Sequence, residues 1–411
     1  MVYGKTNFKT LKANTMKKIS LILYFITLFV VTQSLSQHTI LIRDYIGEPE
    51  QGISDAPNGI WHMSPDIWFN PDDKLDEYNK NPEKIDANSD HKFDTLFQSC
   101  FIYIRLKNTG DKDIDAQTKD RIQVNWAKGN MYLRWSGSFD KYCPVFDKNG
   151  EKTNNPFGGK IGVIDILSLK KGETKVFKLL WNNIPSPNSY RNILNDSDPS
   201  HFCLYVRVVN DSDHAVNHGM GFKEHDAGCP EANSPSIIDS NFLDNIKQGK
   251  RIALRNCTIV PVKPERNPLL RTLVNTVAVS NYEKTEKKIK LRFISGNGKL
   301  DFLKLGSVNI NLNTKDENKP ENIFSYSSES SSEMVVTLKP NERRLAKITF
   351  GLKDIAGIAL NENYPFTILQ YNYDTPTNNY ELVGGETFLV RREKSTCWLW
   401  TWLQSLFSKK K

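Results

Sequence analysis

Amphipathic helical patterning is scarce in this chain of 411 residues. Apolar residues spaced three and four apart occur only over residues 241–248, which excludes a helical bundle. The Cys-x-x-Cys pair of zinc ribbons and thioredoxins is missing. The Gly-x-Ser-x-Gly motif of serine hydrolases is missing as well, and the near match at residues 295–298 (SGNG) is typical of a hairpin turn. The sequence therefore carries no signature of catalysis, and we expect a protein that is not an enzyme.

The folded part of the chain has little net charge. The formal charge of the whole chain is +8, but residues 1–36 contribute +5 and residues 391–411 contribute another +5. The body between them is close to neutral, and it has no basic stripe interleaved with aromatic residues. Nucleic acid is thus excluded as a partner.

The first residues have the composition of a secretory signal. Lys17 and Lys18 precede an apolar run over residues 19–31, and the small residues Ser34 and Ser36 follow it. This order predicts a Sec-type signal peptide over residues 1–36, cut after Ser36, and a location outside the cell or in the cell envelope. The alternative is an uncleaved membrane anchor, although the run is short for a bilayer.

Export makes the cysteines candidates for disulfides, because exported proteins fold in an oxidising compartment. The candidates in the first part of the chain are Cys100, Cys143, Cys203, Cys229 and Cys257, and Cys397 follows near the end. The pairing stays open, and buried free thiols are the alternative.

The chain repeats one pattern. The segment 169–180 (LKKGETKVFKLL) has a counterpart at 338–349 (LKPNERRLAKIT), and both place a Lys-x-Gly/Asn-Glu turn between two strands. Two further pairs occur in the same order, 101–108 with 274–281 and 202–208 with 366–372, each about 170 positions apart. Short alternating strands with regular turn signals predict an all-β protein made of two related β-sandwich domains.

Four segments of the first repeat resemble a known module. They are SPDIW (64–68), YIRLKNTG (103–110), VNWAK (124–128) and HFCLYVR (201–207). Together they resemble an immunoglobulin-like module of secreted bacterial proteins that carries SPDIW, YVRVRNRG, VYWAK and HFCLLAR segments in this order. The second repeat looks like a further immunoglobulin-like domain by its turn at 338–342 and its VGGETF segment at 383–388. The resemblance implies a secreted, non-catalytic module.

These observations predict the following organisation: a signal peptide over 1–36, an immunoglobulin-like β-sandwich with long loops over 37–261, a Pro-rich linker over 262–268, a second immunoglobulin-like β-sandwich over 269–393, and a Trp-rich tail over 394–411. The polar, turn-rich residues 71–93 are expected to form a surface loop, and residues 251–260 the closing strand of the first domain.

One loop carries the residues of a different function. His214 and His218 are four apart, and His225 follows them, so the three could bind zinc in a metal-dependent hydrolase. No Glu follows His214 directly, and Asn217 and Gly219 oppose a helix, so the zinc-protease pattern is not met. A polar loop between two strands is the favoured interpretation, without a cofactor.

Calcium is a weaker possibility at two turns. Residues 210–213 (NDSD) and 111–115 (DKDID) place carboxylates at alternate positions, as a hard cation requires. Neither has the Gly and the distal Glu of an EF-hand loop, and such runs are common in turns because Asp and Asn bond their own backbone.

The end of the chain is apolar and basic. Its docking candidates are Trp398, Trp400, Trp402, Phe407, Lys409, Lys410 and Lys411. The segment is too short to span a bilayer, but Trp residues beside a Lys cluster suit contact with a membrane surface or a partner protein. The alternative is that the tail folds back on the second domain.

The function that these features favour is a secreted or cell-envelope binding or scaffold protein of adhesion type, with a protein or glycan ligand at the cell surface. Two alternatives stay open: the metal-dependent hydrolase, and a subunit of a surface assembly docked through its tail. Trp61, Trp68, Tyr132 and Trp135 lie in loop-rich regions and are expected to be core anchors rather than ligand platforms.

Overall fold

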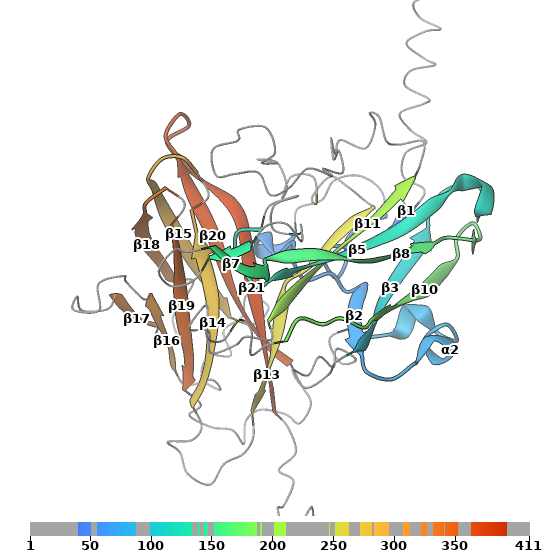
Figure 1. Cartoon of the computed structure of the whole chain (residues 1–411), viewed down its shortest axis with the longest axis horizontal. Coiled ribbons are helices and arrows are strands. Elements are labelled where there is room, and N and C mark those ends of the chain that lie inside the picture. Colours follow the sequence, from blue (N-terminus) through green and yellow to red (C-terminus); the bar gives the residue numbers. More distant parts are fainter. Residues whose placement is uncertain are drawn as a thin grey trace, which may run out of the picture.

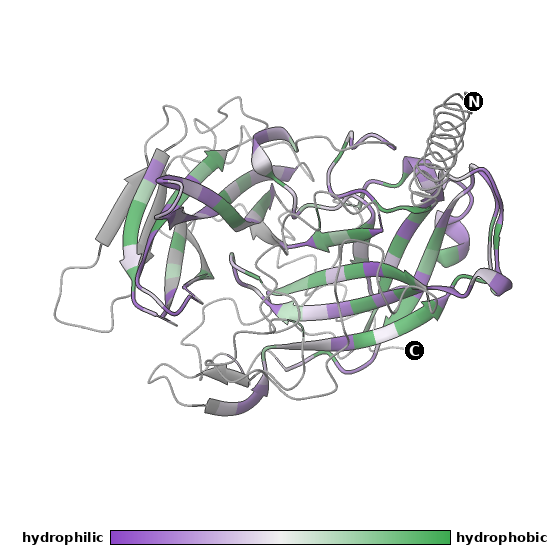
Figure 2. Cartoon of the chain, turned by 90° about the horizontal axis from the view of Figure 1, so that it is seen from above, coloured by the Kyte–Doolittle hydropathy of each residue, from purple (hydrophilic) through white to green (hydrophobic). Residues whose placement is uncertain are grey.

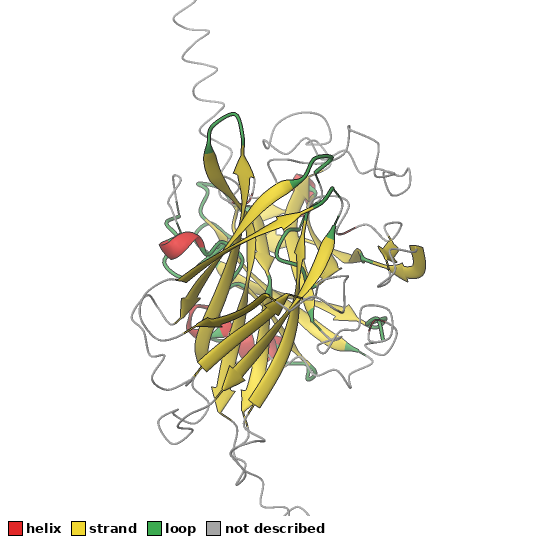
Figure 3. Ribbon diagram, turned by 90° about the vertical axis from the view of Figure 1, so that its left-hand side faces the viewer, coloured by secondary structure: helices red, strands yellow, loops and turns green. Residues whose placement is uncertain are grey.

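The computed structural model of the chain is mostly β, with a few short helical turns (Figure 3). It describes residues 40–50, 56–87, 99–133, 139, 144–146, 152–186, 190, 201–210, 246, 251–262, 272–281, 283–295, 307–312, 322–326, 332–340, 342–351 and 363–392. Hydrophobic and hydrophilic residues alternate along many of the strands, as expected of sheets with one buried face (Figure 2). Among the described residues no helix has the length and hydropathy needed to cross a membrane.

Two sheets make the N-terminal half. Sheet 1 centres on β3 (Cys100–Asn108), which pairs with β10 (Thr174–Trp181) on one side and with β1 (Ile40–Leu41) and β2 (Ile67–Asn70) on the other. Sheet 2 has the order β12 (Ile252–Arg255), β11 (Phe202–Asn210), β5 (Asp120–Lys128), β8 (Gly158–Asp165). Two short ribbons accompany them: β4 (Ile114–Asp115) with β9 (Ser168–Leu169), and β6 (Pro144–Phe146) with β7 (Lys152–Pro156).

Two more sheets make the C-terminal half (Figure 1). Sheet 3 has the order β13 (Cys257–Val262), β21 (Asn379–Arg392), β20 (Asn363–Asp374), β15 (Lys287–Ser295), β18 (Ser332–Leu338). Sheet 4 has the order β14 (Thr272–Ser280), β19 (Arg343–Gly351), β16 (Ser307–Leu312), β17 (Asn322–Tyr326). All pairings are antiparallel except that of β13 with β21.

Each half has a hydrophobic core between its two sheets. In the N-terminal half, Ile102 and Ile104 of β3 share one core with Ile122 and Val124 of β5. The core of the C-terminal half lies between sheets 3 and 4 and has its own members, listed here by strand: Val277 and Val279 (β14), Ile289, Leu291 and Phe293 (β15), Ile348 (β19) and Phe366 (β20). A hydrophobic core between two packed sheets is the arrangement found in β-sandwiches.

The repeat read from the sequence has a counterpart in the strand pairing. β3 pairs with β10 as β14 pairs with β19, and the order β12-β11-β5-β8 matches β21-β20-β15-β18. The turns are equivalent as well: the amide of Lys170 donates to Glu173 Oε2 at 2.6 Å, and the amide of Lys339 donates to Glu342 Oε2 at 2.7 Å. Each turn also receives an Asn from the neighbouring strand, because Asn108 donates to the Leu169 carbonyl and Asn281 to the Leu338 carbonyl.

Two segments differ from their prediction. The strand expected over 251–260 is split at Asn256, and its second part, β13, runs to Val262 and pairs with β21 of the C-terminal half. The segment expected to be a surface loop, residues 71–93, contains α2 (Leu75–Tyr78) and the 3-10 turn η2 (Pro82–Lys84). Tyr78 packs edge-on against Trp68 at 5.3 Å, so this segment covers the outer face of sheet 1.

Candidate functional site

The two halves meet at a buried polar cluster, which we call the junction. It consists of His62, His201, Cys203, Asn256, Thr367, Glu386 and Thr387, all at most 3% exposed. The N-terminal half contributes the start of β11 and the loop before β2, and the C-terminal half contributes β20 and β21. Buried polar groups stabilise a protein only if they are hydrogen-bonded, so their contacts decide what this cluster does.

Asn256 is the centre of the junction. It lies between β12 and β13, where the chain passes from one half to the other. Its Nδ2 donates to the carbonyl oxygens of Asn130 at 3.1 Å and Gly385 at 2.7 Å, and its Oδ1 accepts from Cys203 Sγ at 2.6 Å. Its backbone amide donates to the His62 carbonyl at 2.8 Å, and its carbonyl accepts from the Thr387 amide at 3.2 Å. One residue thus joins both halves through every polar group it has.

His62 and His201 have opposite protonation behaviour. His62 Nε2 lies 3.1 Å from Thr387 Oγ1, and burial lowers its pKa to about 3, so this imidazole is neutral. His201 Nδ1 lies 2.7 Å from Glu386 Oε1. Burial works to lower the pKa of His201, but the charge of Glu386 and hydrogen bonding to Cys203 and Glu386 outweigh it and hold this pKa well above its ordinary value. A buried imidazolium–carboxylate pair therefore joins the residue before β11 to β21.

By residue type, Cys203, His201 and Glu386 match a nucleophile, a base and an orienting acid. Their surroundings do not suit that chemistry. Cys203 and Glu386 are fully buried, and burial raises the pKa of the Cys203 thiol although His201 opposes it. A reactive cysteine needs a lowered pKa and access for its substrate. What the arrangement does support is a fixed contact between the two halves.

Glycines allow the close approach at the junction. A Cβ on Gly384 would lie 1.9 Å from the carbonyl oxygen of Met131, and a Cβ on Gly129 would lie 2.5 Å from His201 Nδ1. Met131 itself belongs to the core of the C-terminal half, and its amide donates to the Ala278 carbonyl at 3.1 Å. The Gly384-Gly385 pair therefore serves backbone contact between the halves.

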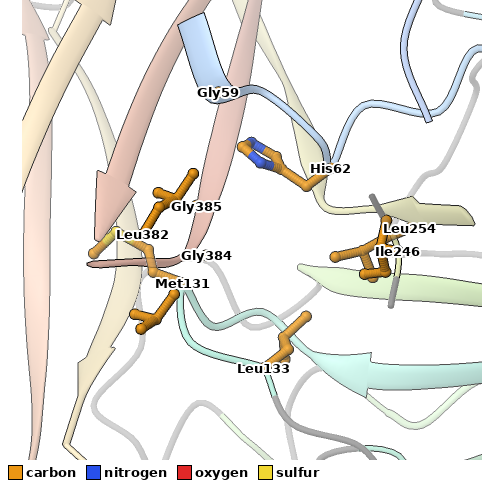
Figure 4. Close-up of a pocket in the computed structure, with 10 residues that line it drawn as sticks. Gly59, His62, Met131, Leu133, Ile246, Leu254, Leu382, Gly384 and Gly385 are labelled. Atoms are coloured by element: carbon orange, nitrogen blue, oxygen red, sulfur yellow. The ribbon is translucent and has the colours of Figure 1, made fainter. Parts of the chain in front are cut away.

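The cavity beside the junction is small. It lies between His62, Met131, Leu133, Leu254 and Leu382 and the backbone of Gly384 (Figure 4). Its volume is about 10 Å³, at the lower limit of what one water molecule requires. A cavity of this size has no room for a substrate.

The SPDIW segment has a structural role. Asp66 accepts from Arg105 Nε at 2.6 Å and from Arg43 at 2.7 Å, in a pair that is almost fully buried on the Arg105 side. Arg105 also donates to the carbonyl oxygens of Pro65, Pro82 and Ile85. Trp68 stacks on Tyr103 at 5.8 Å. These contacts fasten the segment of α2 and η2 onto sheet 1.

The structure describes only some of the residues singled out from the sequence. The zinc candidates His214, His218 and His225 and the tail candidates Trp398, Trp400, Trp402, Phe407, Lys409, Lys410 and Lys411 lie outside the described residues, as does Trp135. Trp61 and Trp68 are core residues, 3% and 0% exposed. Tyr132 is buried too, and its hydroxyl donates to Glu283 Oε1 at 3.3 Å.

Cys100 and Cys203 are free, buried thiols. For these two disulfide candidates the structure therefore has the alternative, a buried free thiol. Cys203 Sγ is directed at Asn256, and burial raises the pKa of Cys100 to about 12. Cys143, Cys229 and Cys397 lie outside the described residues, and so does the side chain of Cys257.

The calcium candidates at residues 111–115 bond to backbone. Asp113 Oδ1 accepts from the Lys171 amide at 2.7 Å, and Asp115 Oδ1 accepts from the Gln117 amide at 2.8 Å. Within the described ranges no three His, Cys, Asp or Glu side chains are placed to hold a metal ion. Of the second candidate, residues 210–213, the structure describes Asn210 alone.

Sequence reasoning missed Asn256 and Glu386. The available signals were an Asn that interrupts an apolar stretch and a Glu inside the otherwise apolar strand LVGGETFLV. A polar residue at a buried strand position needs a partner, but the sequence does not say which one, because His201 and Glu386 are far apart along the chain.

Neither known family patterns nor curated protein sequences match this chain. Among solved structures, the sporulation control protein Spo0M from Bacillus subtilis is similar at 12% identity and a TM-score of 0.17, over 38% of this chain and 51% of that one. The CupB6 tip adhesin from Pseudomonas aeruginosa is similar at 10% identity and a TM-score of 0.18, over 72% and 91%. The major pilin from Streptococcus pyogenes is similar at 8% identity and a TM-score of 0.15, over 67% and 92%. The chain thus spans about half the length of the first of these proteins, and likenesses this distant carry no argument about function.

Proposed function

We propose that this chain is a non-catalytic binding or scaffold protein of adhesion type, secreted or held in the cell envelope, with two tandem immunoglobulin-like β-sandwiches. The observation that carries the proposal is the sealed junction. Cys203 and His201, which match a nucleophile and a base by residue type, are buried, and they contact Asn256 and Glu386. They fix one half against the other and offer nothing to a substrate.

A fixed junction suits a protein that presents surfaces. Contacts between domains of one chain are often loose, and relative motion is the default. Here the contact includes a buried ion pair and hydrogen bonds to backbone groups of both halves. Such a contact holds the exposed faces of the four sheets in one relative orientation, which benefits binding at more than one of them.

Fractionation of cells that express the full chain tests the location. The expected product is shorter than the full chain by the leader and occurs in the envelope fraction or the medium. Labelled purified protein is expected to bind the envelope surface saturably. Full-length protein confined to the cytosol would overturn the proposal.

Removal of residues 396–411 is the matched control for the tail. Binding that persists without these residues assigns it to the sandwiches, and binding that disappears favours the alternative of a tail-docked subunit. Zinc analysis of the purified protein tests the alternative of a metal-dependent hydrolase. Stoichiometric zinc in the unmodified chain that is lost in a His214→Ala, His218→Ala variant would favour this alternative over the proposed function.

A further inference from the structure

The outer face of sheet 3 carries cations and tyrosines side by side. Lys288, Lys290 and Arg292 alternate along β15 with Ile289 and Leu291, which face the core. The three cations therefore share the opposite face, about 7 Å apart along the strand. The neighbouring strands place tyrosines on the same face: Tyr371 is opposite Lys290, and Tyr373 is opposite Tyr380.

The side chains of this face are in contact. Lys290 Nζ lies 5.0 Å from the ring centre of Tyr371 and 4.8 Å from that of Tyr380, and Lys288 Nζ lies 6.0 Å from that of Tyr373. The Tyr373 and Tyr380 rings meet edge to face at 5.2 Å. We call these five residues the Tyr–Lys face.

The Tyr–Lys face lies on an accessible part of the outer side of sheet 3. Farther along β20, Leu369 is buried, and Gly59 of the N-terminal half lies against it and against Leu382. The Tyr–Lys face lies beyond this contact: Lys288 is exposed and the three tyrosines are partly exposed. Val335 of the edge strand β18, opposite Lys290, is 55% exposed. Exposed patches of aromatic and apolar side chains with polar residues around them are typical of binding surfaces.

The charge of this face favours an anionic ligand. Lys288, Lys290 and Arg292 of β15 share this side of sheet 3 with Glu333 of β18. The Glu333 carboxylate lies 3.4 Å from Lys290 Nζ. Ammonium groups form charge-assisted hydrogen bonds with carboxylates. Tyrosine rings supply flat apolar area together with a hydroxyl that bonds polar groups, and they lose little conformational entropy on binding.

We propose that the Tyr–Lys face binds an acidic polysaccharide, with the apolar faces of its sugar rings on Tyr371, Tyr373 and Tyr380 and its carboxylates on Lys288 and Lys290. A sugar ring with a carboxylate matches a flat surface of rings and ammonium groups. A peptide would instead bind through its backbone along a strand edge such as that of β18, and the polyglutamate probe tests that outcome. The inference rests on the proposed function and names the ligand of that function.

Binding of labelled oligogalacturonate to the purified full chain tests the proposal. Fluorescence anisotropy gives the Kd, and a neutral cello-oligosaccharide and polyglutamate serve as comparison probes. Saturable binding of oligogalacturonate is expected, at least about tenfold tighter than that of either comparison probe. No binding of oligogalacturonate, or equal binding of polyglutamate, would overturn the proposal.

Variants locate the site. Tyr373→Ala is expected to weaken oligogalacturonate binding about tenfold, while Tyr373→Phe, which retains the ring, keeps most of the affinity. Lys290→Gln is expected to weaken binding and to reduce its salt dependence. Lys175→Gln is the matched control, since Lys175 Nζ also lies 5.7 Å from an aromatic ring, that of Phe177, but in the N-terminal half.

Unchanged affinity in both Tyr373→Ala and Lys290→Gln, with native circular dichroism, would place the ligand elsewhere and overturn the inference. The proposed function has a separate readout. Envelope binding that survives these variants contradicts the Tyr–Lys face alone, whereas absence of envelope binding by the unmodified chain contradicts the proposed function.

Discussion

Asn256 shows how one polar residue can determine the arrangement of two halves. It is fully buried, and its amide side chain bonds Asn130 and Gly385 from opposite sides of the junction. An Asn side chain offers two N–H donors and one carbonyl acceptor, and here all of them are used. Removal of a buried group of this kind lowers the stability of the protein, because its partners stay buried without a hydrogen bond.

Replacement of Asn256 tests this role. Asn256→Ala leaves the carbonyls of Asn130 and Gly385 and the Cys203 thiol without this partner, and we expect the free energy of unfolding to fall by about 2–4 kcal/mol. Urea denaturation followed by circular dichroism measures the change. Asn154→Ala, at an exposed position of β7, is the control and should stay within about 0.5 kcal/mol of the unmodified chain. A loss in Asn256→Ala no larger than in the control would contradict the central role of Asn256.

The two buried histidines act on stability in opposite pH ranges. The native pKa of His201 is raised, so its contribution is complete below about pH 6.5, the usual pKa of histidine, and is lost as the pH rises through the native value. The native pKa of His62 is about 3, so its contribution is present above about pH 6.5 and is lost as the pH falls toward 3.

Glu386→Gln isolates the contribution of His201. Without the carboxylate, burial alone acts on His201 and lowers its pKa, so the variant loses the stabilisation that depends on the imidazolium. We expect the unmodified chain to exceed Glu386→Gln in stability most strongly near pH 5.5, with the difference shrinking steadily toward pH 8.5. Denaturation curves at several pH values between these limits provide the measurement. A difference that stays constant over this range would mean that His201 is not charged in the native state.

At the scale of elements, patterns within one segment predicted the turns, whereas the pairing of strands far apart in the chain was not predicted. The Lys-x-Gly/Asn-Glu pattern predicted both turns, since the Glu side chain bonds a backbone amide three residues away. The strand predicted over 251–260 was assigned as a whole to the first domain, although its second part, β13, pairs with β21. The apolar pattern of a strand does not indicate which strand lies beside it. The pairing of β13 with β21 joins Cys257 to Thr387, which local patterning cannot anticipate. α2 was missed because four residues are too few to show a helical period.

Gly384 tests the contact between β21 and the segment that contains Met131. In Gly384→Ala the new Cβ would lie 1.9 Å from the Met131 carbonyl, so the backbone of one half must move away from the other. We expect a loss of about 3 kcal/mol or more in the free energy of unfolding. Gly162→Ala is the control, because its nearest neighbour, at 3.0 Å, is the flexible end of the Leu179 side chain. A loss below about 1 kcal/mol in Gly384→Ala would contradict the close approach.

At the scale of the whole molecule, the β class and the repeat could be predicted because alternation along a strand is a local property. The junction could not be predicted, because it gathers residues from the loop before β2, from β11, and from β20 and β21. The segments SPDIW and HFCLYVR were interpreted as signs of an immunoglobulin-like module. In the structure their residues Asp66, His201 and Cys203 make internal contacts. A motif that is specific in sequence can therefore be structural in role.

The junction also predicts how the chain unfolds. Two halves with separate hydrophobic cores unfold independently if little free energy couples them. Here the buried pair of His201 and Glu386, the bonds of Asn256 and the insertion of Met131 into the second core couple them strongly. We expect one calorimetric transition near pH 6.5 for the unmodified chain and two resolved transitions for an Asn256→Ala, Gly384→Ala double variant, because each half retains its own core. Two transitions in the unmodified chain would show that the halves are only weakly coupled, and would remove the physical basis for a single relative orientation of their exposed faces.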